Sequence, residues 1–288
     1  MPSYDPAWLD RMYNNRVLVP EHPAYFQRWA AQSAVARDAL GAHVDLRYGE
    51  GPSETLDVFS AAAPDAPVLV FIHGGYWRAL DKSEHSFVAR PFHERGVCVV
   101  LPNYALCPGT PARPVGIADI ALQMARALEW TWRHIAAYGG DPSRITVAGH
   151  SAGGHLAAML LGCDWKAVAP DLPDDLVRNA LSISGIHDLR PIQHTPFLAP
   201  VLNLTDADSL RVSPALWPAP ARGKLYTVAG GDESAEFLRQ NELIRQAWGA
   251  GVVPVCEALP GHHHFSVLET LADPAQRLHA LAMDLLEK

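Results

Sequence analysis

The chain alternates between short apolar runs and longer segments in which apolar residues recur every three to four positions. The apolar runs predict strands that are buried on both faces, because they have no polar side. These runs cover residues 67–72, 97–101, 145–148, 180–184, 224–228 and 252–257. The segments between them predict helices at residues 83–95, 116–137, 151–161, 235–248 and 274–286. Such alternation predicts right-handed crossovers and an α/β fold with a doubly wound, mostly parallel sheet.

Three other regions depart from this alternation. Residues 25–40 carry apolar positions near a 3.6-residue period and predict a helix. Residues 43–48 and 55–60 alternate on either side of a Gly- and Pro-containing turn and predict an antiparallel hairpin. Residues 188–218 are rich in Pro, Leu and Asp and predict an insertion over the active site. We expect one domain over residues 1–288, with an N-terminal helical segment at about 1–42 and a cap-like insertion at about 188–218.

Residues 149–153 form a G-x-S-x-G pentapeptide centred on Ser151. An apolar run precedes the pentapeptide, and a helical pattern of small residues follows it. In this strand–turn–helix context the pentapeptide predicts a nucleophile elbow, in which the serine hydroxyl is exposed above the carboxyl edge of a sheet. The pattern therefore predicts acyl transfer at Ser151.

A serine hydroxyl needs a general base, and the base needs an orienting carboxylate. In this fold the acid follows the serine along the chain and the histidine comes last. Asp232 lies in a glycine loop after the strand at 224–228, where catalytic groups collect, and it is the favoured acid. Asp188, after the preceding strand, is the rival, and Glu233 is a further contender. Asp232 has the alternative role of capping the helix that begins near Ala235.

Three consecutive histidines follow the last predicted strand, and one of them is the expected base. We favour His264, because Phe265 begins an apolar helical stretch that can anchor the residue before it. His263 and His262 remain alternatives. His150, in the elbow, and His155, one helical turn after the serine, are expected to be structural.

An oxyanion hole is predicted at Gly74 and Gly75, which come after the strand at 67–72 and His73. Their backbone can turn N–H groups toward a developing oxyanion, and the N–H of Ala152, just after the nucleophile, completes the set. His73 is expected to brace this loop through hydrogen bonds.

Composition narrows the expected partners. The 288 residues carry a net charge of −8 without a Lys/Arg cluster, which argues against nucleic acid and anionic membrane as partners. No apolar run has the ~20 residues of a membrane span, and the N-terminus lacks the order of a signal peptide. The four cysteines form no CxxC pair or metal-ligand spacing, which favours reduced thiols and a cytoplasmic location. We expect a small-molecule substrate, no metal and no organic cofactor; a homodimer is compatible with the sequence.

The His73-Gly74-Gly75 loop and the elbow at residues 149–154 together resemble the hormone-sensitive-lipase and carboxylesterase branch of the α/β hydrolases. An antiparallel hairpin that leads into a parallel sheet is the pattern of that fold. The sequences at 103–108 and 139–145 are also similar to patterns of this branch. The resemblance implies an α/β-hydrolase fold and a serine hydrolase or esterase activity.

One departure from that branch narrows the resemblance. Tyr76 and Trp77 follow the two glycines, and the result resembles the HGGxW signature of the kynurenine formamidase (arylformamidase) group. Residues 13–20 also look like bacterial members of that group. The resemblance implies a triad of Ser151, Asp232 and His264.

The same resemblance implies a substrate and a pathway type. It indicates hydrolysis of N-formyl-L-kynurenine to L-kynurenine and formate through a formyl-enzyme, a step of tryptophan catabolism. Trp77 and Tyr104 are candidates to line the pocket for the aromatic leaving group, or else to serve in packing. A carboxylesterase for short acyl or aryl esters is the alternative, and a non-catalytic ligand-binding hydrolase fold is a third hypothesis.

Overall fold

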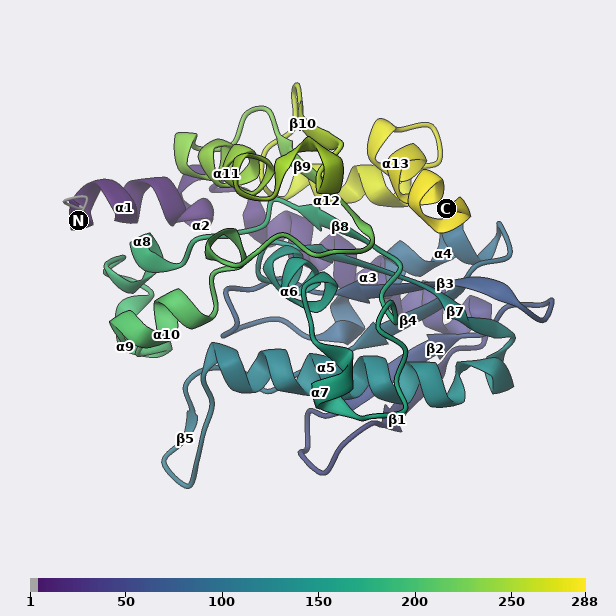
Figure 1. Cartoon of the computed structure of the whole chain (residues 1–288). Coiled ribbons are helices and arrows are strands. Elements are labelled where there is room, and N and C mark those ends of the chain that lie inside the picture. Colours follow the sequence, from purple (N-terminus) through teal and green to yellow (C-terminus); the bar gives the residue numbers. More distant parts are fainter. Residues whose placement is uncertain (1–4) are drawn as a thin grey trace.

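The computed structural model describes residues 5–288, and an eight-stranded sheet of order β1-β2-β4-β3-β7-β8-β9-β10 forms its centre (Figure 1). The strands are β1 (His43–Arg47), β2 (Thr55–Phe59), β3 (Ala66–Ile72), β4 (Cys98–Pro102), β7 (Gly140–His150), β8 (Asn179–Ile183), β9 (Lys224–Gly230) and β10 (Val255–Leu259). β1 pairs antiparallel with β2, and β2 with β4, whereas all other neighbours are parallel. The predicted mostly parallel sheet and its N-terminal hairpin are confirmed.

Helices cover both faces of this sheet. On one face lie α5 (Ile117–His134), α6 (Ala152–Leu161) and α11 (Ala235–Val252). On the other lie α3 (His22–Leu40), α4 (Ala89–His93), α12 (Ser266–Glu269) and α13 (Arg277–Glu287). The remaining elements are short: α1 (Pro6–Tyr13), α2 (Asn15–Leu18), α7 (Trp165–Val168), α8 (Arg190–Gln193), α9 (Ala199–Leu202), α10 (Asp206–Arg211), a hairpin of β5 (Gly109–Thr110) and β6 (Arg113–Pro114), and five 3₁₀ turns.

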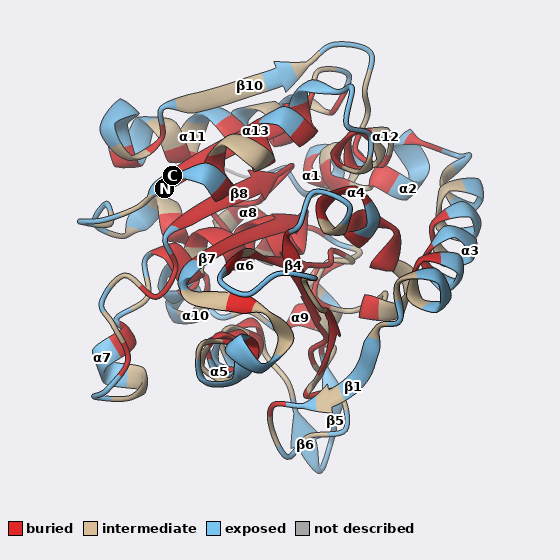
Figure 2. Cartoon of the chain, turned by 90° about the vertical axis from the view of Figure 1, so that its right-hand side faces the viewer, coloured by how far each residue is buried: buried red, intermediate tan, exposed pale blue. Residues whose placement is uncertain are grey.

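The strands have continuous apolar sequences because each of their two faces packs into a separate hydrophobic core. In β3, Val68, Val70 and Ile72 belong to the core under α5 and α6. Leu69 and Phe71, which alternate with them, belong to the core under α3, α4 and α13. Successive side chains of a strand point to opposite faces, so a strand covered on both sides has no solvent face. Figure 2 shows β4 and β8 buried throughout and β7 buried in its second half, whereas β10 at the edge is intermediate or exposed.

The predicted helix at 83–95 is divided in the structure into η1 (Lys82–Glu84), η2 (Ser86–Val88) and α4. Tertiary hydrogen bonds explain the division. The Ser33 hydroxyl accepts from the backbone N–H of Phe87, and Arg37 donates to the backbone carbonyl of Ser83. A continuous α-helix would need these backbone groups for its own ladder.

The two segments set apart in the sequence consist of short elements. Residues 5–42 form α1, α2 and α3, and residues 188–218 form α8, α9, α10 and the 3₁₀ turn η4 (Pro214–Leu216). Their division into a helical segment and a cap remains a prediction. Within residues 5–288, every helix is too short or too polar to cross a bilayer.

His155 joins α6 to the 188–218 segment. Its ring is fully buried, its Nε2–H donates to the Val212 carbonyl at 2.7 Å, and it packs edge-on against Trp77 with centroids 5.0 Å apart. Burial lowers the pKa of His155 to about 4, although the bond to Val212 acts in the opposite direction. Between about pH 4 and pH 6.5, the imidazole is therefore neutral in the folded protein but protonated in the unfolded chain, whose histidine pKa is near 6.5.

We expect this difference to appear as acid sensitivity. Because the unfolded state binds the extra proton, the free energy of unfolding falls as the pH drops from about 6.5 toward 4, and His155 contributes up to about 3 kcal/mol of that fall. His155→Gln keeps an N–H donor but removes the proton site, so urea unfolding across this pH range should show a shallower slope. The control is His134→Gln, at an exposed position, which should leave the slope as it is. An unchanged slope in His155→Gln would contradict a neutral buried imidazole.

Candidate active site

Ser151 occupies a sharp turn between β7 and α6. Its backbone has φ 56° and ψ −116°, a region that side chains with a Cβ rarely adopt. The turn is held from both sides: the Ser151 N–H donates to the Ile183 carbonyl at 2.8 Å, and its own carbonyl accepts from the His155 N–H at 3.1 Å. A strained residue that is over-determined in this way is typical of a functional site.

Glycines flank the serine because the backbone passes close to itself there. A Cβ on Gly153 would lie 2.0 Å from the Ile72 carbonyl oxygen, at the end of β3. A Cβ on Gly149 would lie 2.2 Å from the Gly153 carbonyl oxygen. The start of α6 is therefore in backbone contact with the central strands, which fixes Ser151 relative to the sheet.

His264, after β10, is paired with a buried carboxylate. Its Nδ1–H donates to Glu233 Oε2 at 2.6 Å, and both side chains are almost completely buried. The second oxygen, Oε1, accepts from the Gly230 N–H at 2.7 Å and from the Ser184 hydroxyl. Both oxygens of the carboxylate are thus satisfied, as a buried charge requires.

This arrangement differs from the expectation for the acid. Asp232 is exposed, and the structure does not bring its carboxylate to His264; the neighbouring Glu233 takes that place. The two consecutive side chains differ in exposure, because Asp232 is exposed and Glu233 is buried. Asp188, the other rival, is engaged elsewhere, because both of its oxygens accept hydrogen bonds from Arg190.

The three histidines have distinct surroundings. The Nδ1 of His263 accepts from two backbone N–H groups, and its Nε2 is hydrogen bonded to the Tyr25 hydroxyl at 3.1 Å. Both nitrogens of His263 are therefore occupied, and His262 is only half-buried. His264 alone of the three pairs with a carboxylate, and because its Nδ1 is committed, Nε2 is the nitrogen left for a proton transfer in the pocket.

His150 supports His264 through a hydrogen bond to its backbone. The Nε2–H of His150 donates to the His264 carbonyl at 2.8 Å, and the two rings lie 4.7 Å apart. Burial lowers the pKa of His150 well below its usual value, so this imidazole is a neutral support. Phe237 packs on another side of the His264 ring, at 4.5 Å between centroids. The His264 ring is thus positioned through its backbone, its Nδ1 and its face.

The glycine loop after β3 is braced by His73, as predicted. His73 is hydrogen bonded to the Gly74 carbonyl at 2.8 Å and to the Asn103 side chain at 3.0 Å. The Tyr104 hydroxyl donates to the carbonyls of His73 and Gly74, at 3.0 and 3.1 Å. In a trans peptide the N–H points opposite to the C=O, so the N–H groups of Gly74 and Gly75 are directed away from Tyr104.

The same loop lies against the nucleophile. A Cβ on Gly74 would lie 3.1 Å from the Ser151 Cβ and 2.9 Å from the His150 carbonyl oxygen. Gly75 has φ 105°, and a Cβ there would meet the Ala79 carbonyl oxygen at 2.0 Å, so only glycine fits. Ala152, the third predicted oxyanion residue, is the first residue of α6, and its N–H belongs to a helix N-terminus.

The two residues proposed to line the substrate pocket lie elsewhere. Trp77 and Tyr104 are at most 1% exposed and belong to the core, the first against His155 and the second stacked on His73 at 4.2 Å. Their packing alternative is therefore the one that the structure bears out. Tyr76, not Trp77, faces the pocket.

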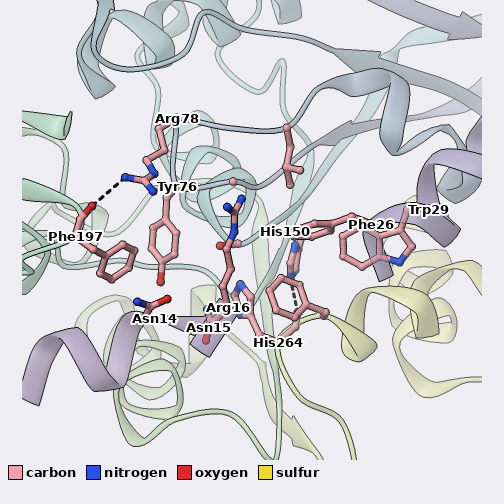
Figure 3. Close-up of a pocket in the computed structure, with 14 residues that line it drawn as sticks. Asn14, Asn15, Arg16, Phe26, Trp29, Tyr76, Arg78, His150, Phe197 and His264 are labelled. Atoms are coloured by element: carbon pink, nitrogen blue, oxygen red, sulfur yellow. Dashed lines mark hydrogen bonds between the residues drawn. The ribbon is translucent and has the colours of Figure 1, made fainter. Parts of the chain in front are cut away.

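Ser151 and His264 open into one cavity of about 210 Å³ (Figure 3). Its other walls come from the glycine loop, from Phe197 and, unexpectedly, from the N-terminal helices. Lining residues from that N-terminal part are Asn14, Asn15, Arg16, Phe26 and Trp29. The sequence held one signal for this contribution, the likeness of residues 13–20 to bacterial formamidase-like proteins. Elsewhere, within residues 5–288, no group of three or more His, Cys, Asp or Glu side chains is arranged to hold a metal ion.

The sheet order, and the position of Ser151 at the carboxyl end of the central strand β7, are those of an α/β hydrolase. A model of the carboxylesterase family matches residues 52–190. The kynurenine formamidase of Danio rerio is 31% identical over 99% of this chain and 95% of its own length. The Drosophila melanogaster kynurenine formamidase is 30% identical over 94% of this chain and 90% of its own. The chain belongs to the kynurenine formamidase family of the α/β hydrolases, and it is a hydrolase.

Solved structures share the α/β-hydrolase fold of this chain. A crystal structure of a Silicibacter sp. protein, provisionally described as a thioesterase, shares 33% identity and a TM-score of 0.83, covering 96% of this chain and 98% of its own. An esterase from Pyrobaculum calidifontis has a TM-score of 0.68 over 99% of both chains at 16% identity, and this likeness shows the fold alone.

The close approach at the elbow can be tested by substitution. Gly153→Ala would force a methyl group against the Ile72 carbonyl, and we expect a loss of about 3 kcal/mol in the free energy of unfolding, measured in urea. Gly251→Ala is the matched control, because no atom lies within 4 Å of a Cβ at that position in α11. Equal stability of the two variants would show that the elbow has room to relax.

Proposed function

We propose that this enzyme hydrolyses the formamide of N-formyl-L-kynurenine to L-kynurenine and formate, with Ser151, His264 and Glu233 as its triad. The observation that carries the proposal is the buried His264–Glu233 pair, which opens into the same cavity as the strained Ser151. Membership of the kynurenine formamidase family supports the substrate.

In the proposed first step, Ser151 Oγ attacks the formyl carbon while His264 Nε2 accepts the hydroxyl proton. Glu233 keeps the other proton on Nδ1 and stabilises the imidazolium that forms. The N–H groups of Gly74, Gly75 and Ala152 would donate to the tetrahedral oxyanion. The imidazolium then protonates the aniline nitrogen, the C–N bond breaks, and L-kynurenine leaves a formyl ester on Ser151.

The second half of the reaction reuses the same groups. His264 takes a proton from a water molecule, the water oxygen attacks the formyl ester, and formate leaves as Ser151 regains its proton. A formyl group offers little surface for recognition, and the glycine loop lies directly against Ser151 on that side. Substrate selection therefore falls to the leaving group and to the cavity that receives it.

The choice of acid is testable with two neighbouring variants. Glu233→Gln replaces the acceptor of the Nδ1–H bond with an amide that favours the wrong tautomer, and we expect kcat to fall by about 10³- to 10⁴-fold. Asp232→Asn, at the exposed neighbour, should change kcat less than about threefold. Circular dichroism and the thermal midpoint establish that both variants fold. The opposite ranking would assign the acid to Asp232.

The substrate is testable by comparing kcat/KM for N-formyl-L-kynurenine and p-nitrophenyl acetate. We expect efficient turnover of the formamide, and Ser151→Ala should abolish both reactions as well as labelling by a fluorophosphonate. The match to the carboxylesterase family favours short acyl or aryl esters as the second candidate. Ester turnover and Ser151 labelling without any formamide turnover would establish that alternative instead.

A further inference from the structure

Two arginines line the pocket without a carboxylate partner. Arg16, in α2, has its guanidinium 5.6 Å from the centre of the Phe26 ring. Arg78, in the loop after β3, donates one hydrogen bond to the Phe197 carbonyl at 2.9 Å. Within residues 5–288, the ion pairs between arginines and carboxylates include neither Arg16 nor Arg78. Figure 3 shows the Arg16 side chain reaching toward the middle of the pocket.

The two pocket arginines belong to a protein whose net charge is −8. Elsewhere, arginines that lie near carboxylates are paired with them, as in Arg133–Asp171, Arg239–Glu236 and Arg277–Glu257. The pocket wall, in contrast, contains two arginines and no Asp or Glu. The charged side chains that line the pocket are therefore all positive, and they can attract the negatively charged group of a ligand.

Asn15 supplies a second, independent observation at the same wall. Its side chain is only 4% exposed, lines the pocket, and has an Nδ2 with no hydrogen-bond partner among the residues that the structure describes. A buried amide donor without an acceptor is costly, and such groups are normally satisfied. The adjacent Arg16 adds further N–H donors, so this part of the wall offers donors and lacks acceptors of its own.

We propose that Arg16 and Asn15 form a carboxylate subsite, and that the enzyme selects substrates whose leaving group carries a carboxylate. The proposal rests on the proposed function for the position of the chemistry. A planar guanidinium matches a carboxylate with two parallel hydrogen bonds, and the amide of Asn15 supplies a third donor. Arg78 is fixed to Phe197 and acts through its charge. An aryl formamide with an amino-acid side chain has its carboxylate on the leaving group.

The first test compares Arg16→Gln with wild type on two formamides. One is N-formyl-L-kynurenine, and the other is 2′-formamidoacetophenone, which has the same aryl formamide without the amino-acid group. We expect kcat/KM for the charged substrate to fall about 10- to 100-fold, mainly through KM, because the lost contact is made in ground and transition states alike. The uncharged substrate should change less than twofold. Arg11→Gln, at an exposed arginine of α1 outside the pocket, should affect neither substrate.

A second pair of substrates separates this proposal from the proposed function. Hydrolysis of 3-acetoxybenzoate and of its methyl ester reports the same charge selection without a formamide. If formamides are not cleaved but Arg16→Gln selectively impairs the charged ester, the subsite stands and the proposed substrate fails. If N-formyl-L-kynurenine is cleaved but Arg16→Gln lowers kcat/KM for charged and uncharged substrates equally, or for neither, the formamidase activity stands and the subsite is overturned.

Discussion

The hydrogen bond between His264 and Glu233 is the interaction on which the rest of the site depends. Each partner follows a different strand, Glu233 after β9 and His264 after β10, and Ser184, which also binds the carboxylate, directly follows β8. These strands are adjacent and parallel, so their carboxyl ends meet at one edge of the sheet. Ser151 follows β7, the next strand in the order. The bond depends on the parallel pairing of β9 with β10, which brings the loops that carry Glu233 and His264 to the same edge.

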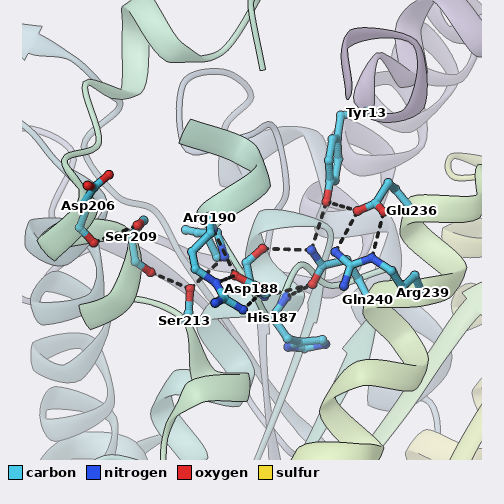
Figure 4. Close-up of polar contacts among 11 residues, drawn as sticks. Tyr13, His187, Asp188, Arg190, Asp206, Ser209, Ser213, Glu236, Arg239 and Gln240 are labelled. Carbon is cyan, nitrogen blue, oxygen red and sulfur yellow. Dashed lines mark hydrogen bonds and ion pairs between the residues drawn. The ribbon is translucent and has the colours of Figure 1, made fainter. Parts of the chain in front are cut away.

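A second network secures the wall of the pocket. The Tyr13 hydroxyl, at the end of α1, donates to Glu236 and accepts from Gln240, both on α11 (Figure 4). The Gln240 side chain also accepts from the backbone N–H groups of His187 and Asp188. One buried glutamine thus joins the N-terminal helices, α11 and the loop after β8. The segment that carries Asn15 and Arg16 is consequently fixed to the helix that begins just after Glu233.

The sequence predicted the fold because its two signals, the apolar runs of the strands and the periodicity of the helices, are both local. Apolar runs with alternating burial and periodic helices are visible without any knowledge of packing, as in β3, where adjacent side chains enter different cores. The helix boundaries differ from the prediction where a side chain from elsewhere binds a backbone group. At the divided helix, the Ser33 hydroxyl accepts a hydrogen bond from the backbone N–H of Phe87. The turn at Ser151 was equally local, since its glycines are required by backbone approach alone.

The parts of the site that the sequence missed depend on side-chain direction and long-range packing. Asp232 and Glu233 are one residue apart, and only the path of the loop determines which carboxylate turns inward. Tyr76 and Trp77 both have positive φ, at 52° and 56°, so their directions do not follow from an extended or helical pattern. Arg16 reaches the pocket from a helix far from the catalytic motifs in the sequence, and the one signal for this segment was the likeness of residues 13–20 to formamidase-like proteins.

The proposed chemistry and the proposed specificity are carried by different parts of the chain. Around Ser151, backbone atoms of the elbow and of the glycine loop fill the space so closely that a Cβ on Gly74 would press against the serine. That side of the site can vary little without displacing the nucleophile. The opposite wall consists of side chains from α2 and α3, among them the buried Asn15 and Trp29 and the exposed Arg16. Substitutions there can change the charge and shape of the cavity while the elbow and the His264–Glu233 pair remain intact. If the proposed carboxylate subsite is correct, substitutions in the N-terminal helices would change the substrate while leaving the catalytic groups in place.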